Sequence, residues 1–196
     1  MDNTKEFIID KAFELFLNHS YEAVSISEIS KAIELTKGAL YHHFRNKEEL
    51  FMAVVDKYLI IEELDINTNN ISLIQFIELC VVKAQDIVSK TVGSSRSFIP
   101  LNLLSFFIDA FRHYPDFSAK KNDLINSEIN KTKKILDQAI VNGEIRSDIN
   151  TSVTAEMFFT LNTGIAKNLI HGNMNQKLAI DKLREQLLEF YKLLKI

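Results

Sequence analysis

The chain has 196 residues, of which 46% are hydrophobic and 25% charged, a composition that excludes a wholly disordered protein. Its formal charge of −3 excludes a protein that attracts nucleic acid through a large overall positive charge. Five glycines, two prolines and no tryptophan, beside fourteen phenylalanines, favour an all-α fold over a turn-rich sheet fold.

The first predicted helix covers about residues 4–18. Apolar residues recur there at spacings of four, three and one, which places them on one face of a helix. They are Ile8, Ala12, Leu15 and Phe16.

Capping residues mark the start of three further helices. Ser25 and Glu28 have the spacing of a capping box, in which each side chain accepts a hydrogen bond from the other residue's backbone amide. Thr36 is a typical N-cap residue, and Asn46 followed by Glu49 repeats the capping pattern. These helices are expected at about residues 26–33, 36–44 and 47–63.

Longer periodic segments follow residues 65–70, whose three asparagines mark the predicted end of an N-terminal module. Gly143 stands where the C-cap of a helix is expected, and Pro115 fits the first turn of the helix after it. No credible strand is found. The expected helices cover residues 71–90, 98–113, 116–142, 151–171 and 175–194. The sequence therefore predicts an all-α fold of about nine helices.

Positive charge is concentrated in a short part of the N-terminal module. Residues 1–58 contain six lysines and one arginine against ten acidic residues, a net charge of −3. Residues 31–47 contain three lysines and one arginine against Glu34 alone, a net charge of +3. Any contact with DNA must therefore come from a small cationic face.

Two short helices between two longer ones are the outline of a helix-turn-helix. In the third helix, Leu40 and Phe44 are four residues apart and can both point inward. The remaining side chains can then face outward, and their small size and hydrogen-bond donors suit contact with base edges in a major groove. They are Lys37, Gly38, Ala39, Tyr41 and His42.

The segment from Ser25 to Leu50 resembles the helix-turn-helix and the start of the fourth helix in TetR-family repressors. The most specific parts are Gly-Ala-Leu-Tyr-His-His-Phe at residues 38–44 and Lys-Glu-Glu-Leu at residues 47–50. With the first helix, the resemblance covers about residues 5–58, less than a third of the chain.

The resemblance implies a role for each residue of this segment that matches the family pattern. Thr36 and Tyr41 would contact phosphate, and Ser25, Ser27 and Lys47 would hold the DNA backbone at helix N-termini. Phosphate at such termini is also favoured by the helix dipole. The residues facing the bases would be Lys37, Gly38, Ala39 and His42. Tyr41 could alternatively pack against the neighbouring module, His42 and Lys47 could simply be solvated, and His43 is expected to be packed.

Two positions depart from the family pattern. Glu34 stands in the turn where the family usually has glycine, so a residue with a side chain is expected in a left-handed conformation there. Ser30 stands where the family favours alanine, a change that affects core packing more than DNA contact.

The sequence divides into a helix-turn-helix DNA-binding domain at residues 1–47 and a ligand-binding and dimerisation domain at residues 48–196. The predicted function is a dimeric transcriptional regulator, usually a repressor, that binds an inverted-repeat operator in double-stranded DNA and is released by a small apolar or amphipathic effector. The alternatives are a helical DNA-binding dimer without effector and an enzyme or carrier on a helical scaffold.

The middle helices are rich in phenylalanine, which suits either an ordinary core or an effector pocket. TetR-type regulators usually hold an effector cavity in this region. The residues predicted to line it are Phe76, Cys80, Phe107, Phe111 and His113, and Asn102 and Asp109 could supply further polar contacts.

Apolar stripes on the last two long helices predict a four-helix interface between two copies of the chain. The alternative is that the stripes close only the core of the single chain. The predicted interface residues are Phe158, Leu161, Ile165, Leu169, Leu183, Leu187 and Tyr191; Phe190 and Leu194 continue the second stripe.

Other classes of function lack a sequence pattern. The five histidines form no HExxH or His-Cys cluster, and there is no GxSxG, P-loop or GxGxxG, so we expect no enzyme, metal site or cofactor. The single Cys80 excludes an internal disulfide. No run approaches the ~18 apolar residues of a membrane span, and a cytoplasmic protein is expected.

Overall fold

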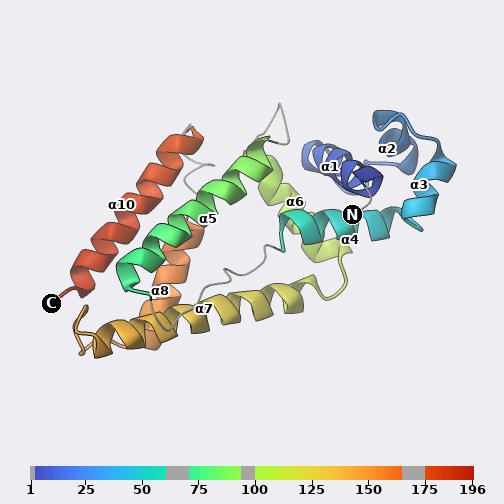
Figure 1. Cartoon of the computed structure of the whole chain (residues 1–196). Coiled ribbons are helices and arrows are strands. Elements are labelled where there is room, and N and C mark those ends of the chain that lie inside the picture. Colours follow the sequence, from blue (N-terminus) through green and yellow to red (C-terminus); the bar gives the residue numbers. More distant parts are fainter. Residues whose placement is uncertain (1–2, 61–70, 94–99, 165–174) are drawn as a thin grey trace. The chain divides into compact units, whose positions relative to one another are not determined.

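The computed structural model describes residues 3–60, 71–93, 100–164 and 175–196. In these ranges the chain forms nine helices, and the only pairing between extended residues is one isolated antiparallel bridge, between Ile145 and Lys195 (Figure 1). The predicted all-α fold is confirmed. None of the described helices is long and apolar enough to cross a membrane.

The helices start close to the predicted positions. They are α1 (Asn3–Asn18), α2 (Ile26–Ala32), α3 (Lys37–His43), α4 (Lys47–Tyr58), α5 (Leu73–Gly93), α6 (Pro100–His113), α7 (Phe117–Val141), α8 (Thr151–Thr163) and α10 (Gln176–Leu194).

Helix boundaries differ from the prediction at α4, α5 and α7, and α5 begins and ends two to three residues later than expected. The helix α4 ends at Tyr58, earlier than residue 63. Pro115 lies in the turn before α7 and not in its first turn, because Asp116 has a φ of 61° and redirects the chain before α7 begins. Gly143, with a φ of 68°, ends α7 as predicted. The second half of the helix predicted at residues 151–171 lies outside the described residues.

The chain divides into two compact units. Unit 1 is formed by residues 1–62 and 91–121, and so contains α1 to α4, α6 and the start of α7. Unit 2 is formed by residues 63–90 and 122–196, and contains most of α5 and α7 together with α8 and α10. The predicted boundary between residues 47 and 48 separates a DNA-binding domain from a ligand-binding and dimerisation domain, and this assignment of functions stays a prediction. The packing units are different, because α4 and α6 pack with the N-terminal helices in unit 1.

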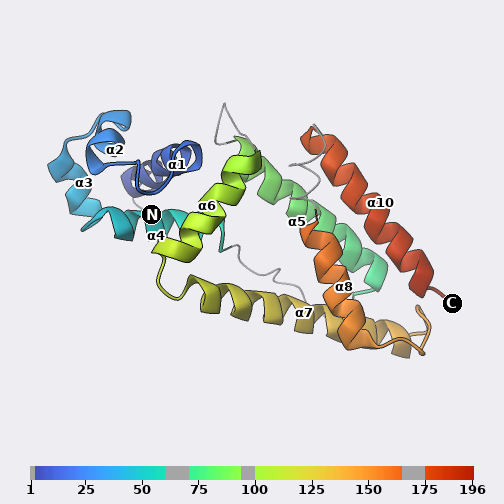
Figure 2. The same cartoon turned by 180° about the vertical axis from the view of Figure 1, so that it is seen from behind.

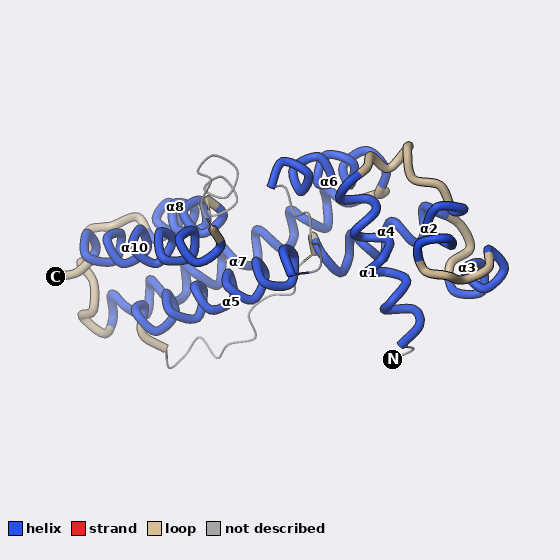
Figure 3. The backbone as a smooth tube through the Cα atoms, turned by 90° about the horizontal axis from the view of Figure 1, so that it is seen from above, coloured by secondary structure: helices blue, strands red, loops and turns tan. Residues whose placement is uncertain are grey.

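Unit 1 is held together by an aromatic core. The ring of Phe13 stacks on Tyr58 at 3.6 Å, and Phe106 of α6 meets the edges or faces of Phe13 and Phe51, each at 5.6 Å. Each fully buried phenylalanine of this kind contributes about 1.5–3 kcal/mol to folding. The core thus fixes α1 and α4 as the support on which α2 and α3 lie (Figure 3).

Unit 2 is closed by α8 and α10, which lie beside α5 (Figure 2). The rings of Phe76 and Phe158 stack at 5.5 Å. The carboxylate of Glu144 accepts hydrogen bonds from the amides of Leu73 and Ile74 at 3.0 and 3.2 Å, which satisfies free donors at the start of α5.

The structure changes the predicted dimer surface. Leu183 and Leu187 are completely buried within the single chain, and Phe158 is 2% exposed. These three side chains have almost no surface left for a second copy, so their assignment to an interface was wrong. Periodicity identified the apolar face of α10, but that face packs inside unit 2. Leu161 and Tyr191 are partly exposed, and Ile165 and Leu169 lie outside the described residues.

Candidate nucleic-acid interface

The helix α2 begins with the capping box that the sequence predicts. The Ser25 amide donates to Oε2 of Glu28 at 2.7 Å, and the Glu28 amide donates to Oγ of Ser25 at 3.2 Å. Ser25 and Ser27 are both exposed at this helix start. The departure at Ser30 is accommodated, because its buried hydroxyl donates to the carbonyl of Ser27 at 3.2 Å.

The turn between α2 and α3 depends on Glu34. Its φ of 56° confirms the predicted left-handed conformation at a residue with a side chain. Two backbone hydrogen bonds close this turn. The amide of Glu34 donates to the carbonyl of Lys31, and the amide of Leu35 donates to the carbonyl of Ser30. This is the bonding pattern of a Schellman motif, normally ended by glycine. It directs the chain sharply into α3.

The helix α3 has the two faces that the sequence predicts. Leu40 is 0% exposed and Phe44 is 1% exposed, so both fix the helix to the core of unit 1. On the opposite face, Tyr41 is 50% exposed and Ala39 is half-buried. The other residues predicted to face outward are exposed: Lys37, Gly38 and His42. His43 is half-buried, as expected for a packed histidine.

The glycine in α3 is not required by the fold. A Cβ at Gly38 would have only the Oγ1 of Thr36 within 4 Å, at 3.9 Å, which is ordinary contact. Its φ is not in the left-handed region, where glycine is preferred. A glycine here therefore weakens the helix without being needed for the fold.

Thr36 and Asn46 cap α3 and α4. The Thr36 hydroxyl accepts from the amide of Ala39 at 3.2 Å, and the Asn46 side chain accepts from the amide of Glu49 at 2.7 Å. The Glu49 carboxylate accepts from the amide of Arg45 at 2.7 Å, one residue earlier than an ordinary capping box, and also pairs with the Arg45 guanidinium at 3.0 Å. The hydrogen bond from the Arg45 amide lowers the pKa of Glu49.

Lys47 has a structural role that the sequence did not indicate. Its ammonium donates to the carbonyls of Tyr21 and Val24 at 2.9 and 3.1 Å and lies 4.0 Å from the centre of the Tyr21 ring. Lys47 therefore ties the turn between α1 and α2 to the start of α4. Its phosphate contact stays a prediction, and the ammonium has only three donors for both tasks.

The exposed face formed by α2, α3 and the residue before Asn46 is cationic. Lys31 and Lys37 are exposed, and the Arg45 side chain is 88% exposed although it pairs with Glu49. Glu34 is also exposed on this side of the turn. We call Lys31, Lys37, Tyr41, His42 and Arg45 the α3 face.

The residues predicted to bind an effector fall in both units. Phe76 and Cys80 are buried in unit 2, where burial raises the pKa of the Cys80 thiol to about 12 and makes it a poor nucleophile. Phe107 and Phe111 lie in unit 1 with rings 5.0 Å apart, and Phe111 is half-exposed.

His113, the last predicted effector residue, lies instead beside Glu22 and Asp109. The sequence pattern did not indicate this group. Asp109 and His113 are four residues apart on one helix, a spacing that could have marked them as a pair of ligands. Glu22 is remote in sequence, and nothing in the pattern connects it to α6.

Comparison with known proteins matches the N-terminal module. The family described as "Bacterial regulatory proteins, tetR family" matches residues 8–54. The Transposon Tn10 TetC protein of Escherichia coli is 42% identical over 66 residues. This segment spans about a third of each of the two chains, 34% in both cases.

Solved structures match over a much larger part of the chain. MexZ, described as a key repressor responsible for antibiotic resistance in Pseudomonas aeruginosa, has a TM-score of 0.71 and 14% identity over 100% of this chain and 96% of its own. A complex of SmeT with triclosan has a TM-score of 0.64 and 19% identity over 95% of this chain and 90% of its own. At these identities the likeness is one of fold.

The family match covers the helices that carry the α3 face, from Ile8 in α1 to Val54 in α4. The fold likeness extends over the remaining helices. The helix-turn-helix geometry, the family match and the shared all-α fold agree: residues 8–54 match the TetR family of bacterial regulatory proteins, and the rest of the chain shares the fold of solved TetR-type structures.

Proposed function

We propose that the chain is a sequence-specific DNA-binding transcriptional regulator, a repressor, that places α3 in the major groove. The observation that carries this proposal is the α3 face. Lys37 and His42 offer hydrogen-bond donors on an exposed surface, and Gly38 adds no side chain to it. On the opposite face of α3, the buried side chains of Leu40 and Phe44 pack against the core of unit 1. A small exposed helix with this division can approach base edges closely.

Phosphate contacts would fix the register of α3 in the groove. The starts of α2 and α3 are exposed at Ser25, Ser27 and Thr36, and helix N-termini attract phosphate through their free amides. Tyr41 projects from α3 with half of its surface exposed, which suits a phosphate contact from its hydroxyl. Lys47 would contribute mainly by holding the turn before α2 in place.

The chain would act as a homodimer on an inverted-repeat operator, because one α3 reads only a short half-site. In unit 2 two of the exposed apolar side chains are not among those predicted. On α8, Val153 is 49% exposed and Met157 is 52% exposed, one helical turn apart. We place the second copy on this face of α8, with Leu161 continuing it.

A small apolar or amphipathic molecule would release the DNA. Support comes from the shared fold of SmeT, whose structure was solved with triclosan, and from the three phenylalanines of α6 and Phe76 of α5. A ligand shifts DNA binding only by its different affinity for the two arrangements, typically a ~5- to 150-fold effect.

The function is tested by selecting genomic DNA fragments that the chain binds and footprinting the bound site. The footprint should show two half-sites related by a two-fold axis, roughly 10 bp apart or somewhat more. Lys37→Ala and His42→Ala should then change which bases are preferred at the half-site. Lys192→Ala, on α10 in unit 2, is the control and should bind as the natural chain does. Selection that enriches no common sequence would overturn the proposal.

The effector is tested separately. Apolar metabolites that raise the melting temperature of the chain are added to the DNA complex, and at least one should lower the affinity for the selected site by ~5-fold or more. If compounds bind but leave the affinity for DNA unchanged, the chain is a DNA-binding dimer without effector control.

A further inference from the structure

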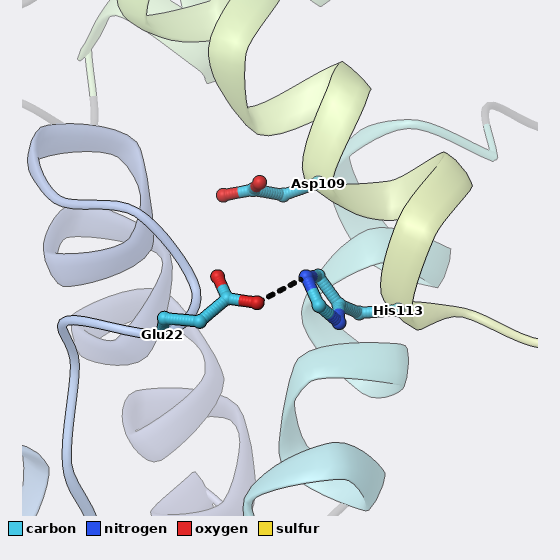
Figure 4. A group of neighbouring side chains, drawn as sticks. All are labelled: Glu22, Asp109 and His113. Atoms are coloured by element: carbon cyan, nitrogen blue, oxygen red, sulfur yellow. Dashed lines mark ion pairs between the residues drawn. The ribbon is translucent and has the colours of Figure 1, made fainter.

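Three side chains that the proposed function does not use lie together in unit 1. Glu22 belongs to the turn after α1, and Asp109 and His113 lie one helical turn apart on α6 (Figure 4). One carboxylate oxygen from each acid and one imidazole nitrogen all lie within 4.8 Å of one another. Folding thus brings Glu22 beside two potential metal ligands of α6 that are far from it in the sequence.

Asp109 is a buried carboxylate. It is 4% exposed, and its Oδ2 accepts a hydrogen bond from the backbone amide of Tyr21 at 2.8 Å. Within the described residues no ion pair with a lysine or arginine is found for it. The hydrogen bond positions the carboxylate, whose nearest potential cationic partner is the imidazole of His113.

His113 directs a buried nitrogen at the acids. Its Nε2 lies 2.8 Å from Oε1 of Glu22, an ion pair if the imidazole is protonated, and this buried nitrogen has no hydrogen-bond partner. The imidazole stacks on the Tyr21 ring at 4.2 Å and meets the edge or face of Phe51 at 6.5 Å. The ring is therefore held in place while its Nε2 makes no hydrogen bond.

We propose that Glu22, Asp109 and His113 bind one first-row divalent cation, with Zn²⁺ as the cation that fits best. A nitrogen with two carboxylate oxygens is a ligand set typical of such ions, whereas Mg²⁺ and Ca²⁺ prefer oxygen alone. Metal bonds of about 2.0–2.2 Å place ligand atoms roughly 3–4 Å apart. The Glu22 side chain is 65% exposed and can rotate to complete this geometry.

The cation would join the turn between α1 and α2 to α6. That turn also holds the two carbonyls bound by Lys47 and leads directly into the capping box of α2. A metal bond at Glu22 would therefore fix the position from which α2 starts. Any effect on DNA affinity rests on the proposed function, while binding of the cation does not.

The test uses the full chain, freed of metal with a chelator and then desalted. Zn²⁺ is titrated in competition with a chromophoric chelator, without DNA. The natural chain should bind one Zn²⁺ per chain. Glu22→Gln, Asp109→Asn and His113→Gln should each weaken binding by about 100-fold or more, since disturbing only the partners of ligands already costs about 10- to 100-fold.

Two features keep the test decisive. Glu22→Gln changes an exposed side chain, so its circular dichroism should match that of the natural chain even if Asp109→Asn is less stable. His19→Gln removes another exposed histidine three residues from Glu22 and should leave Zn²⁺ affinity unchanged. The proposal is overturned if the natural chain binds no Zn²⁺, Co²⁺ or Ni²⁺ at micromolar concentration, or if folded Glu22→Gln binds Zn²⁺ as tightly as the natural chain.

Discussion

At the scale of single residues, a substitution at Gly38 should change the stability of the chain and its DNA affinity in opposite directions. Because a Cβ there meets nothing closer than 3.9 Å, Gly38→Ala should fold normally and stabilise α3 by up to about 1 kcal/mol. The added methyl group stands on the α3 face, so specific DNA affinity should fall by ~10-fold or more, which corresponds to about 1.4 kcal/mol. Thermal unfolding and fluorescence anisotropy with labelled operator measure the two effects.

Gly143 provides the matched control. It also has open space around it, but its φ of 68° lies in the left-handed region. Gly143→Ala should therefore lower stability by roughly 1 kcal/mol through backbone strain while leaving DNA affinity unchanged. If Gly38→Ala binds operator as well as the natural chain does, α3 does not approach the bases at this position.

Glu34 has the opposite problem, a side chain at a position that favours glycine. Glu34→Gly should relieve the strain at φ 56° and remove an acid beside the α3 face, so both stability and DNA affinity should rise. Glu34→Gln removes the charge but keeps the strain, and should raise affinity alone. An unchanged melting temperature in Glu34→Gly would show that the left-handed turn costs nothing here.

At the scale of elements, the start of α2 is sensitive to acid. The hydrogen bond from the Ser25 amide lowers the pKa of Glu28 below its ordinary value of 4.5. A lowered pKa in the folded state means that the stabilisation is complete above about pH 4.5 and is lost as the pH falls through the folded pKa. The melting temperature of the natural chain should therefore approach that of Glu28→Gln as the pH is lowered from 7 to 3.

A matched comparison isolates this effect. Gln retains an oxygen that can accept from the Ser25 amide but does not titrate, so Glu28→Gln keeps the cap without its pH dependence. Because Glu49 also has a lowered pKa, Glu28→Gln/Glu49→Gln should lose more of the pH dependence than either single variant. A difference in melting temperature that is constant from pH 7 to 3 would contradict the assignment.

Lys47 connects the turn between α1 and α2 to the start of α4, so its replacement should lower the stability of the folded chain. Lys47→Met retains the unbranched stem and loses two hydrogen bonds to carbonyls, at a cost of about 1–2 kcal/mol. If Lys47 also contacts phosphate, the salt dependence of DNA affinity should flatten by about one phosphate contact. The loss of stability is measured by thermal unfolding, and the DNA affinity is measured at a temperature well below the melting temperature. A melting temperature equal to that of the natural chain would refute the connecting role.

Local sequence signals predicted most of the N-terminal module. The caps at Ser25, Thr36 and Asn46, the left-handed Glu34 and the two faces of α3 follow from interactions within about five residues. For that reason they could be predicted without knowing the tertiary structure.

Long-range contacts could not be predicted in the same way. Periodicity marks Leu183 and Leu187 as apolar-facing but does not say whether their own chain or a second copy covers them. The Lys47 ammonium and the Glu22, Asp109 and His113 group depend on segments brought together only by folding. The sequence shows that these residues are present but does not show how close folding brings them to one another.

At the scale of the whole molecule, the described burial moves the expected dimer surface to the exposed face of α8. Met157→Glu should shift the chain from dimer to monomer in sedimentation at micromolar concentration, because it places a charge in an apolar contact. Leu187→Glu is unsuitable for this test, since a charge at that fully buried position would unfold unit 2.

Val141→Glu is the control for this substitution. Val141 is 78% exposed at the end of α7, so the change adds the same charge to an exposed apolar residue on another helix than Met157. It should leave the dimer intact. If the natural chain sediments as a monomer at micromolar concentration, the dimer proposal fails, whatever the variants do.

The central claim is that the α3 face recognises a particular DNA sequence, and the most direct test compares two affinities at physiological salt. The full chain is titrated into labelled duplexes that carry either the footprinted site or the same bases in scrambled order. We expect the footprinted site to bind at least roughly 10³-fold more tightly, the usual lower range for specific recognition. Equal affinity for the two duplexes would contradict sequence-specific binding and, with it, the proposed function.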